Sequence, residues 1–413
     1  MNERGIGGQR GWRGFVAGMV LATLALAGCS GPERAADEPP PPSVVTATAA
    51  LPAPTEALPG SPTAAGTLAT PTMQTLPTAT TIPTPVSISR ACAPGIDLLG
   101  FSDALDKTVV DGARVGNISA IAWAGGDDYL GLSDRDGFVY RIAFPLGGTP
   151  KAQSAFQLTD AAGEPYPTDS IDGEGLALDG GDLLVASEVG PAVNRYDSAG
   201  RLLAAFPVPQ RFLVAPDGQG TLNQTFESLA LSADGQTLWT GNERPLAGDG
   251  EDADGRGRVR LLRYRREGDT FVLDAEYAYL TEPGQGLSEL IALGDGSLLA
   301  LERGLSLKTG FTAQVYRVTL GGATDVTQID ALDGAGATPA TKTLFVDLSQ
   351  CPVTPGGGPA GPFSPLLDNF EGMTFGPDLA DGRHSLLLVS DDNDQSLQVT
   401  RLIALAIDPR VLP

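Results

Sequence analysis

The chain has 413 residues, a formal net charge of −23, 53 glycines, 33 prolines and a single histidine. This composition is typical of an acidic protein rich in turns and strands, and not of a helical one. The negative charge argues against nucleic acid as a partner, whereas it favours solubility and the binding of cations.

Residues 1–28 are predicted to be an export signal. Three arginines precede an apolar stretch from Phe15 to Ala27, which is too short to span a bilayer comfortably. The stretch ends in LAGC, which resembles the lipobox of bacterial lipoproteins, whose cysteine is acylated and becomes the mature N-terminus. Cys29 is therefore expected to anchor an exported protein to the membrane of the bacterial cell envelope. The alternative is an ordinary cleaved signal, in which Cys29 is discarded.

Residues 29–90 are rich in Pro, Thr and Ala and contain almost no large apolar side chains. Such a segment cannot bury enough surface to offset the entropy that ordering would cost. We expect an extended, disordered tether that holds a folded domain, residues 91–413, away from the lipid. With Cys29 assigned to lipid, Cys92 and Cys351 remain as a potential disulfide in an oxidising compartment, and two free buried thiols are the alternative.

One motif recurs through residues 91–413. Each copy places a polar residue at the start of an apolar run, as in NISAIAWAGGDD, DGEGLALDG, TFESLALSADG, GLSELIALGDG and NFEGMTFGP. After a turn, a second apolar run ends on an acidic or amide group, as in DLLVASEVG. The repeated unit is therefore two strands joined by a hairpin. The polar residues that begin the copies are Ser119, Glu174, Glu227, Glu289 and Glu371.

The spacing of the copies predicts an all-β fold, a β-propeller. The intervals of 55, 53, 62 and 82 residues between these positions leave room for four-stranded blades with loop insertions. The last unit is one strand short, so we expect the segment GIDLLGFSDAL after Cys92 to join the C-terminal blade and close the ring. We expect five blades in a monomer, and six if the insertion from Gly334 to Pro365 forms a further sheet.

The first strand of each blade in a propeller lines the central axis, so equivalent residues lie at one height around it. The five repeat residues, Ser119 and the four glutamates, would then form a ring. The carboxylates repel one another, and a cation relieves the repulsion. Calcium accepts many oxygen ligands in loose geometry, whereas zinc prefers His or Cys. We therefore predict one axial Ca²⁺ ion.

A wider acidic circle is expected at the same mouth, because the second strand of each blade runs antiparallel to the first. Its members would be Asp134, Glu188, Glu243, Glu302 and Asp391. Arginines follow three of them, as Arg135, Arg244 and Arg303. A cation and arginines together suit a phosphate ester, because both neutralise charge on phosphoryl oxygens. The alternative is a structural role, in which the acids accept backbone hydrogen bonds and the arginines pair with them.

Several of these segments resemble the phytase-like family, exported bacterial β-propeller domains often described as having esterase-like activity. The resemblance is carried by LSDRDG, DGEGLAL, ASEVG with NRY, ESLALSADG with NERP, LSELIALGDGSLLALERG and DNFEGMTFGPDLADGRHSLLLVSDDND. It covers nearly all of residues 91–413 and none of the tether. It implies a propeller and, less specifically, the hydrolysis of an ester.

The chemistry expected is metal-assisted. A serine esterase needs a histidine to take the serine proton, and the one histidine, His384, is expected at the opposite mouth. The G-x-S-x-G motif is also absent. We predict a calcium-dependent hydrolase of ester or phosphoester bonds, with Glu174 or Glu371 as the base. The alternative is a non-catalytic module that binds an unknown ligand at the cell surface and uses its axial cation only for rigidity.

Overall fold

The computed structural model describes residues 90–353, 361 and 363–412. The predicted export signal, the lipidation site Cys29 and the tether up to residue 89 lie outside the described residues. Within the described part of the chain, no helix has the length and apolar character needed to cross a membrane.

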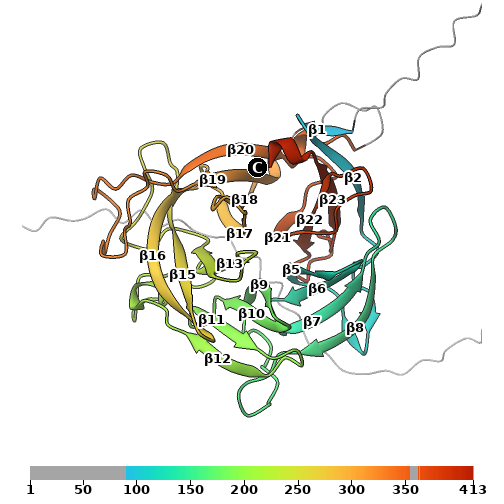
Figure 1. Cartoon of the computed structure of the whole chain (residues 1–413), viewed down its shortest axis with the longest axis horizontal. Helices are drawn as coiled ribbons and strands as arrows, with labels where there is room; N and C mark the ends of the chain where they lie inside the picture. Colours follow the sequence, from blue (N-terminus) through green and yellow to red (C-terminus); the bar gives the residue numbers. More distant parts are fainter. Residues whose placement is uncertain (1–89, 354–360, 362, 413) are drawn as a thin grey trace, which may run out of the picture. The chain divides into compact units, whose positions relative to one another are not determined.

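Five antiparallel sheets surround a central axis as the blades of a propeller (Figure 1). In the first four blades, each strand pairs with the next one along the chain. Blade 1 contains β5 (Ile118–Gly125), β6 (Asp128–Ser133), β7 (Phe138–Ala143) and β8 (Lys151–Gln157). Blade 2 contains β9 (Gly173–Asp179), β10 (Asp182–Ser187), β11 (Ala192–Tyr196) and β12 (Leu202–Phe206). Blade 3 contains β13 (Phe226–Leu231), β14 (Thr237–Asn242), β15 (Arg258–Glu267) and β16 (Thr270–Leu280).

Blade 4 contains β17 (Gly286–Ala292), β18 (Leu298–Ser306), β19 (Gly310–Thr319) and β20 (Thr341–Asp347). Blade 5 joins the two ends of the described chain, in the order β1-β2-β23-β22-β21. Its strands are β1 (Ala91–Ala93), β2 (Ile96–Ser102), β21 (Asn369–Phe375), β22 (His384–Asp391) and β23 (Leu402–Ile407). Strand β2 pairs antiparallel with β23, from Ile96 opposite Ile407 to Ser102 opposite Leu402. A disulfide joins Cys92 of β1 to Cys351.

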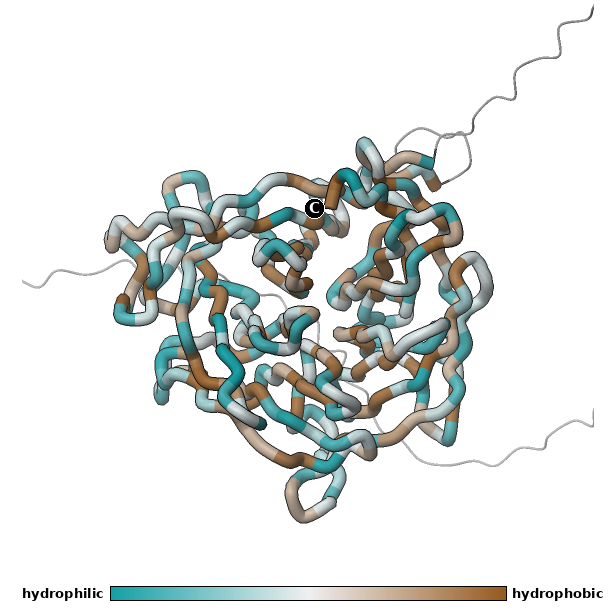
Figure 2. Tube along the Cα trace, viewed as in Figure 1, coloured by the Kyte–Doolittle hydropathy of each residue, from teal (hydrophilic) through white to brown (hydrophobic). Residues whose placement is uncertain are grey.

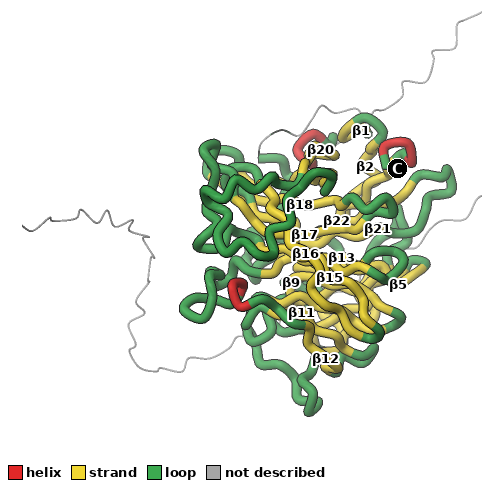
Figure 3. Tube along the Cα trace, turned by 60° about the vertical axis from the view of Figure 1, so that its left-hand side comes forward, coloured by secondary structure: helices red, strands yellow, loops and turns green. Residues whose placement is uncertain are grey.

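The remaining elements are short. A two-residue hairpin, β3 (Val109–Val110) with β4 (Ala113–Arg114), precedes blade 1. Three 3-10 turns lie at Gln210–Phe212, Leu348–Gln350 and Pro409–Val411. The described part of the insertion from Gly334 to Pro365 supplies only β20 of blade 4, so it adds no sixth sheet. The prediction of an all-β propeller with five blades is confirmed. Figure 3 distinguishes the strands of the blades from the loops that connect them.

Apolar side chains fill the spaces between neighbouring blades. For example, Leu130 of blade 1 and Leu183 of blade 2 belong to one buried cluster, and Leu261 of blade 3 and Leu290 of blade 4 belong to another. Figure 2 shows brown apolar positions interspersed with teal hydrophilic ones along the chain around the axis. Burial of this surface is the main force that holds one blade against the next.

The innermost strands of adjacent blades approach one another closely because glycines lie where their backbones meet. A Cβ atom on Gly175 of β9 would lie 2.7 Å from the backbone nitrogen of Leu229 in β13. A Cβ atom on Gly372 of β21 would lie 2.9 Å from the backbone nitrogen of Ile121 in β5. Glycine at these two positions lets the backbones of adjacent blades meet.

Candidate functional site

A β-bulge near the start of each innermost strand positions the ring residues. In every blade the register with the second strand shifts by one residue at this point, which leaves one extra residue on the inner strand. A bulge re-aims the extra side chain instead of letting it alternate across the sheet. The extra residues are Ser119, Glu174, Glu227, Ser288 and Glu371.

Blade 4 corrects the ring predicted from sequence, because its ring member is Ser288 and not Glu289. Leu287 pairs with Glu302 and Glu289 pairs with Leu301, so Ser288 is the bulged residue. Glu289 lies one residue beyond the ring and is buried. Its Oε1 accepts hydrogen bonds from the backbone nitrogens of Leu229 in blade 3, at 3.0 Å, and of Leu290, at 2.8 Å. Burial raises the pKa of Glu289 well above its usual range.

In blade 4 the outer position predicted from the sequence is also wrong by one residue. In blades 1, 2, 3 and 5 the outer circle consists of Asp134, Glu188, Glu243 and Asp391. Each of them directly follows the second-strand residue that pairs with the residue just before the bulge. In blade 4 the corresponding residue is Arg303, since Glu302 pairs with Leu287. Glu302 instead accepts hydrogen bonds from Tyr279 and from the backbone nitrogen of Glu282, and it pairs with Lys342. Glu302 is therefore not part of the acidic mouth.

Arg303 carries a positive charge into the ring. Its guanidinium lies 2.7 Å from Glu371 Oε1, 3.3 Å from Glu243 Oε1 and 3.6 Å from Glu227 Oε2. Gly286 makes room for this arrangement, because a Cβ atom there would lie 2.5 Å from Glu243 Oε1. Burial works to lower the pKa of Arg303, but the surrounding glutamates raise it overall. The half of the mouth formed by blades 3 to 5 thus has its own built-in cation.

The other half of the mouth contains a carboxylate triad. One oxygen from each of Asp134, Asp172 and Glu174 lies within 4.8 Å of the others. Asp172 precedes β9, and its backbone oxygen accepts a hydrogen bond from Glu188 N at 2.9 Å. Sequence reasoning missed Asp172. The feature of the sequence that points to Asp172 is its position, two residues before the ring residue of its blade. The equivalent residues of the other blades are Asn117, Thr225, Gly286 and Asn369.

Burial and mutual repulsion raise the pKa of the carboxyl groups around the triad. Burial first, and then Glu371, raise the pKa of Asp134 to about 8. Burial and Asp172 raise the pKa of Glu188 to about 8. Burial likewise raises the pKa of Glu174 well above its usual range, followed by repulsion from Glu227. At neutral pH this half of the mouth therefore needs either protons or a cation.

The arginines that follow the outer circle have different surroundings. Arg135 Nε lies 2.9 Å from Asp169 Oδ1, beside the triad. Arg244 Nε lies 3.4 Å from Glu243 Oε1, beside Arg303. Arg135, Arg244 and Arg303 are thus all at the acidic mouth, but only Arg303 reaches the ring.

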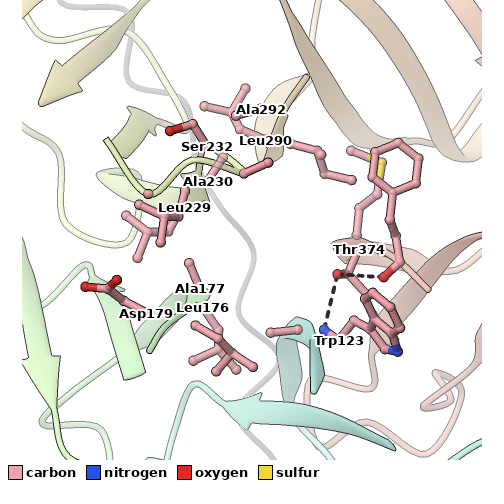
Figure 4. A pocket seen from close by; sticks show the side chains of 18 of the residues that line it. Trp123, Leu176, Ala177, Asp179, Leu229, Ala230, Ser232, Leu290, Ala292 and Thr374 are labelled. Carbon is pink, nitrogen blue, oxygen red and sulfur yellow. Dashed lines mark hydrogen bonds between the residues drawn. The ribbon is translucent and has the colours of Figure 1, made fainter. Parts of the chain in front are cut away.

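The opposite mouth is a separate cavity of about 530 Å³ with both apolar and polar lining residues. Figure 4 shows that residues from the ends of the inner strands, such as Leu176, Leu229 and Leu290, line it, with Trp123 at one side. His384 opens β22 next to this end of blade 5, and its Nδ1 lies 2.7 Å from Asp378 Oδ1. The histidine and the ring residue Glu371 therefore lie at opposite ends of the hairpin formed by β21 and β22, which leaves the acidic mouth without an imidazole base.

Fold and site together define a five-bladed propeller with a carboxylate-rich mouth. A model of the Phytase-like family, described as "Esterase-like activity of phytase", matches residues 113–394, and the chain belongs to this family. No curated protein matches the chain.

Similar solved structures include several enzymes of low identity. A streptogramin B lyase is 10% identical, with 75% of this chain and 98% of that chain covered and a TM-score of 0.33. The PQQ-bound aldose sugar dehydrogenase from Streptomyces coelicolor is 12% identical, with 76% and 98% covered and a TM-score of 0.36. A putative oxidoreductase (glucose dehydrogenase) from Thermus thermophilus is 13% identical, with 74% and 99% covered and a TM-score of 0.33. These likenesses carry no argument about the activity of this chain.

Proposed function

We propose that the chain is an exported, lipid-anchored hydrolase of ester or phosphoester bonds that depends on calcium held at the acidic mouth. The observation that carries the proposal is the triad of Asp134, Asp172 and Glu174, whose oxygens converge within 4.8 Å. Family membership supports ester chemistry through the description of the family model. The predicted signal and Cys29 support attachment to the cell envelope.

The residues present suit a hard divalent cation. All three members of the triad offer carboxylate oxygens, which are the ligands that calcium prefers. The pKa of each is raised above its ordinary value by burial, so the carboxylates gain from a positive charge. The ion is expected off the axis, between blades 1 and 2, because Arg303 already neutralises Glu227, Glu243 and Glu371. This position replaces the axial one that the sequence suggested.

A bound ion would supply a Lewis acid that polarises the scissile group and favours ionisation of a water molecule. Glu188 is the candidate general base, because it adjoins Asp172 and its pKa of about 8 is close to neutral. The backbone nitrogen of Thr225 donates a hydrogen bond to Glu188 and fixes its carboxyl group. Glu371 is less suited to this role, since Arg303 and Asn369 both bind its Oε1.

A second function rests on a different observation. The guanidinium of Arg303 contacts three glutamates and ties blades 3, 4 and 5 together at the axis. If the charges at the acidic mouth serve only to hold the blades together, the protein is a non-catalytic module that binds a ligand at the cell surface. In either case the acidic chain is proposed to act as a monomer without nucleic acid.

The test is hydrolysis by the purified full-length chain of p-nitrophenyl phosphate, bis-p-nitrophenyl phosphate and p-nitrophenyl acetate, with calcium or with a chelator. The hydrolase proposal expects turnover that requires calcium and that Asp172→Asn abolishes. Asp269→Asn, in the exposed turn between β15 and β16, removes the same charge as a control. Absence of turnover on all three substrates, in a chain that still binds calcium, would favour the binding module.

A further inference from the structure

A second cavity adjoins the triad on its outer side. Its volume is about 330 Å³, and Arg114, Asn117, Arg135, Asp136, Tyr140 and Asp394 are among the residues that line it. Ser133 lines it as well, and Ser133 and Arg135 flank Asp134 of the triad in the sequence. The cavity therefore opens next to the proposed metal ligands and away from Arg303.

Two guanidinium groups in this cavity converge on one carboxylate. Arg114 Nη1 lies 2.7 Å from Asp394 Oδ1, and Arg135 Nη1 lies 3.4 Å from Asp394 Oδ2. The two oxygens of Asp394 are thus held by different arginines. A pair of arginines that brackets a carboxylate from two sides has the donor geometry for any oxyanion of similar size.

Other contacts fix the two arginines in place. Arg114 Nη2 lies 3.0 Å from Asp392 Oδ2, and the hydroxyl of Tyr140 donates a hydrogen bond to the backbone oxygen of Arg114 at 2.6 Å. Arg135 Nε donates to Asp169 Oδ1 at 2.9 Å. Neither guanidinium depends on Asp394 alone for its position, so the pair remains when Asp394 leaves.

An orphaned polar group supplies an independent observation. Asn117 is only 7% exposed, and its side-chain oxygen Oδ1 is buried without a hydrogen-bond partner. A buried acceptor without a partner is costly, and the hydroxyl of a protonated phosphoryl group is a donor that can satisfy it. The backbone oxygen of Asn117 accepts a hydrogen bond from Asp134 N at 3.0 Å, which connects the cavity wall directly to the triad.

We propose that this cavity is an oxyanion subsite in which Arg114 and Arg135 bind a phosphoryl group and Asp394 is an internal competitor that the phosphoryl group displaces. As a statement about substrate, this rests on the proposed hydrolase function and narrows it to phosphoesters. The binding of a free oxyanion does not depend on that function.

The surrounding charges explain why Asp394 controls affinity. Asp136, Asp169 and Asp392 also face the cavity or its arginines, so carboxylates outnumber the two guanidinium groups while Asp394 is in place. Removal of the Asp394 charge frees Arg114 Nη1 and Arg135 Nη1 and reduces the excess of carboxylates at the point where the oxyanion binds. Asp394 is half exposed on the loop after β22 and adopts a φ of 52°, a conformation that asparagine also tolerates.

The experiment is titration calorimetry of the full-length chain with inorganic phosphate in the presence of a chelator, which separates this subsite from the triad. Asp394→Asn is expected to tighten phosphate binding about tenfold, and Arg135→Gln to weaken it by about the same factor. Asp269→Asn and Arg265→Gln, both in the exposed end of blade 3, are the matched charge controls and should leave the affinity unchanged.

Equal phosphate affinity in Asp394→Asn and in the unaltered chain would overturn the proposal, as would equal effects of the control variants. Tighter binding of acetate than of phosphate would overturn the assignment to a phosphoryl group. Calcium titration of Asp172→Asn distinguishes the two proposals: loss of calcium binding in this variant tests the triad, whatever the result with phosphate.

Discussion

Replacement of the guanidinium in the ring, by Arg303→Met, tests whether an internal cation holds one half of the mouth together. The side chain of Arg303 is 18% exposed, and it lies 2.7 Å from Glu371 and 3.3 Å from Glu243. Removal of one partner from a buried ion pair leaves an uncompensated charge and costs about 3–5 kcal/mol. At pH 8 in chelator we expect the free energy of unfolding to fall by that amount.

The loss should depend on pH, because the glutamates can take up protons once the guanidinium is gone. Burial raises the pKa of Glu227 and of Glu371 even with Arg303 present, so both protonate readily as the pH falls. At pH 5 the loss should therefore be clearly smaller than at pH 8. Urea denaturation followed by far-ultraviolet circular dichroism at the two pH values measures both quantities.

The control is Arg265→Met. Arg265 and Glu267 form an exposed pair at 2.7 Å, and such pairs contribute between zero and about 1 kcal/mol. A loss in Arg303→Met no larger than in this control at pH 8, or an equal loss at pH 5 and pH 8, would refute the assignment of Arg303 as the cation of the ring.

Three further predictions concern the triad and the axis. Asp172→Asn should weaken calcium binding in titration calorimetry by about tenfold or more, because a charged ligand is lost, and an unchanged affinity would remove Asp172 from the site. The pKa of Asp134 is raised to about 8 by burial, so its contribution to the stability of the chelated chain is present below about pH 4 and is lost as the pH rises through 8. Calcium should accordingly raise the Tm more at pH 8 than at pH 5, and an equal rise would contradict the shift. Gly175→Ala should destabilise the fold by about 1–3 kcal/mol in urea denaturation, because its Cβ would lie 2.7 Å from Leu229 N, and a neutral effect would show that the inner strands can separate.

The sequence predicted the ring of blades because each blade repeats one pattern. An apolar run, a turn and a second apolar run recur with a polar residue at the same place, and burial between blades requires that pattern in every copy. The sequence also aligned Glu174, Glu227 and Glu371 with one another, and each is the bulged residue of its inner strand. Local pattern was sufficient there, because these three copies align without ambiguity.

Blade 4 shows where the pattern failed. In GLSELIAL both Ser288 and Glu289 are polar, and apolar periodicity cannot say which of two adjacent residues is the extra one at a bulge. The pairing of β17 with β18 makes Ser288 the extra residue. The same register turns Glu302 away from the ring and Arg303 toward it. A shift of one residue exchanges the direction of every side chain, so a cation stands where an acid was expected.

By itself, therefore, the sequence determined the class of fold and the repeat of acids at equivalent positions, and it favoured five blades over six. Only the tertiary structure decided which acids are neutralised by Arg303 and which remain together as Asp134, Asp172 and Glu174. The physical reason is that charge compensation depends on distances of a few ångströms between different blades. Those distances are set by strand register and by the space that glycines such as Gly286 leave, and neither is encoded in the spacing of the repeat.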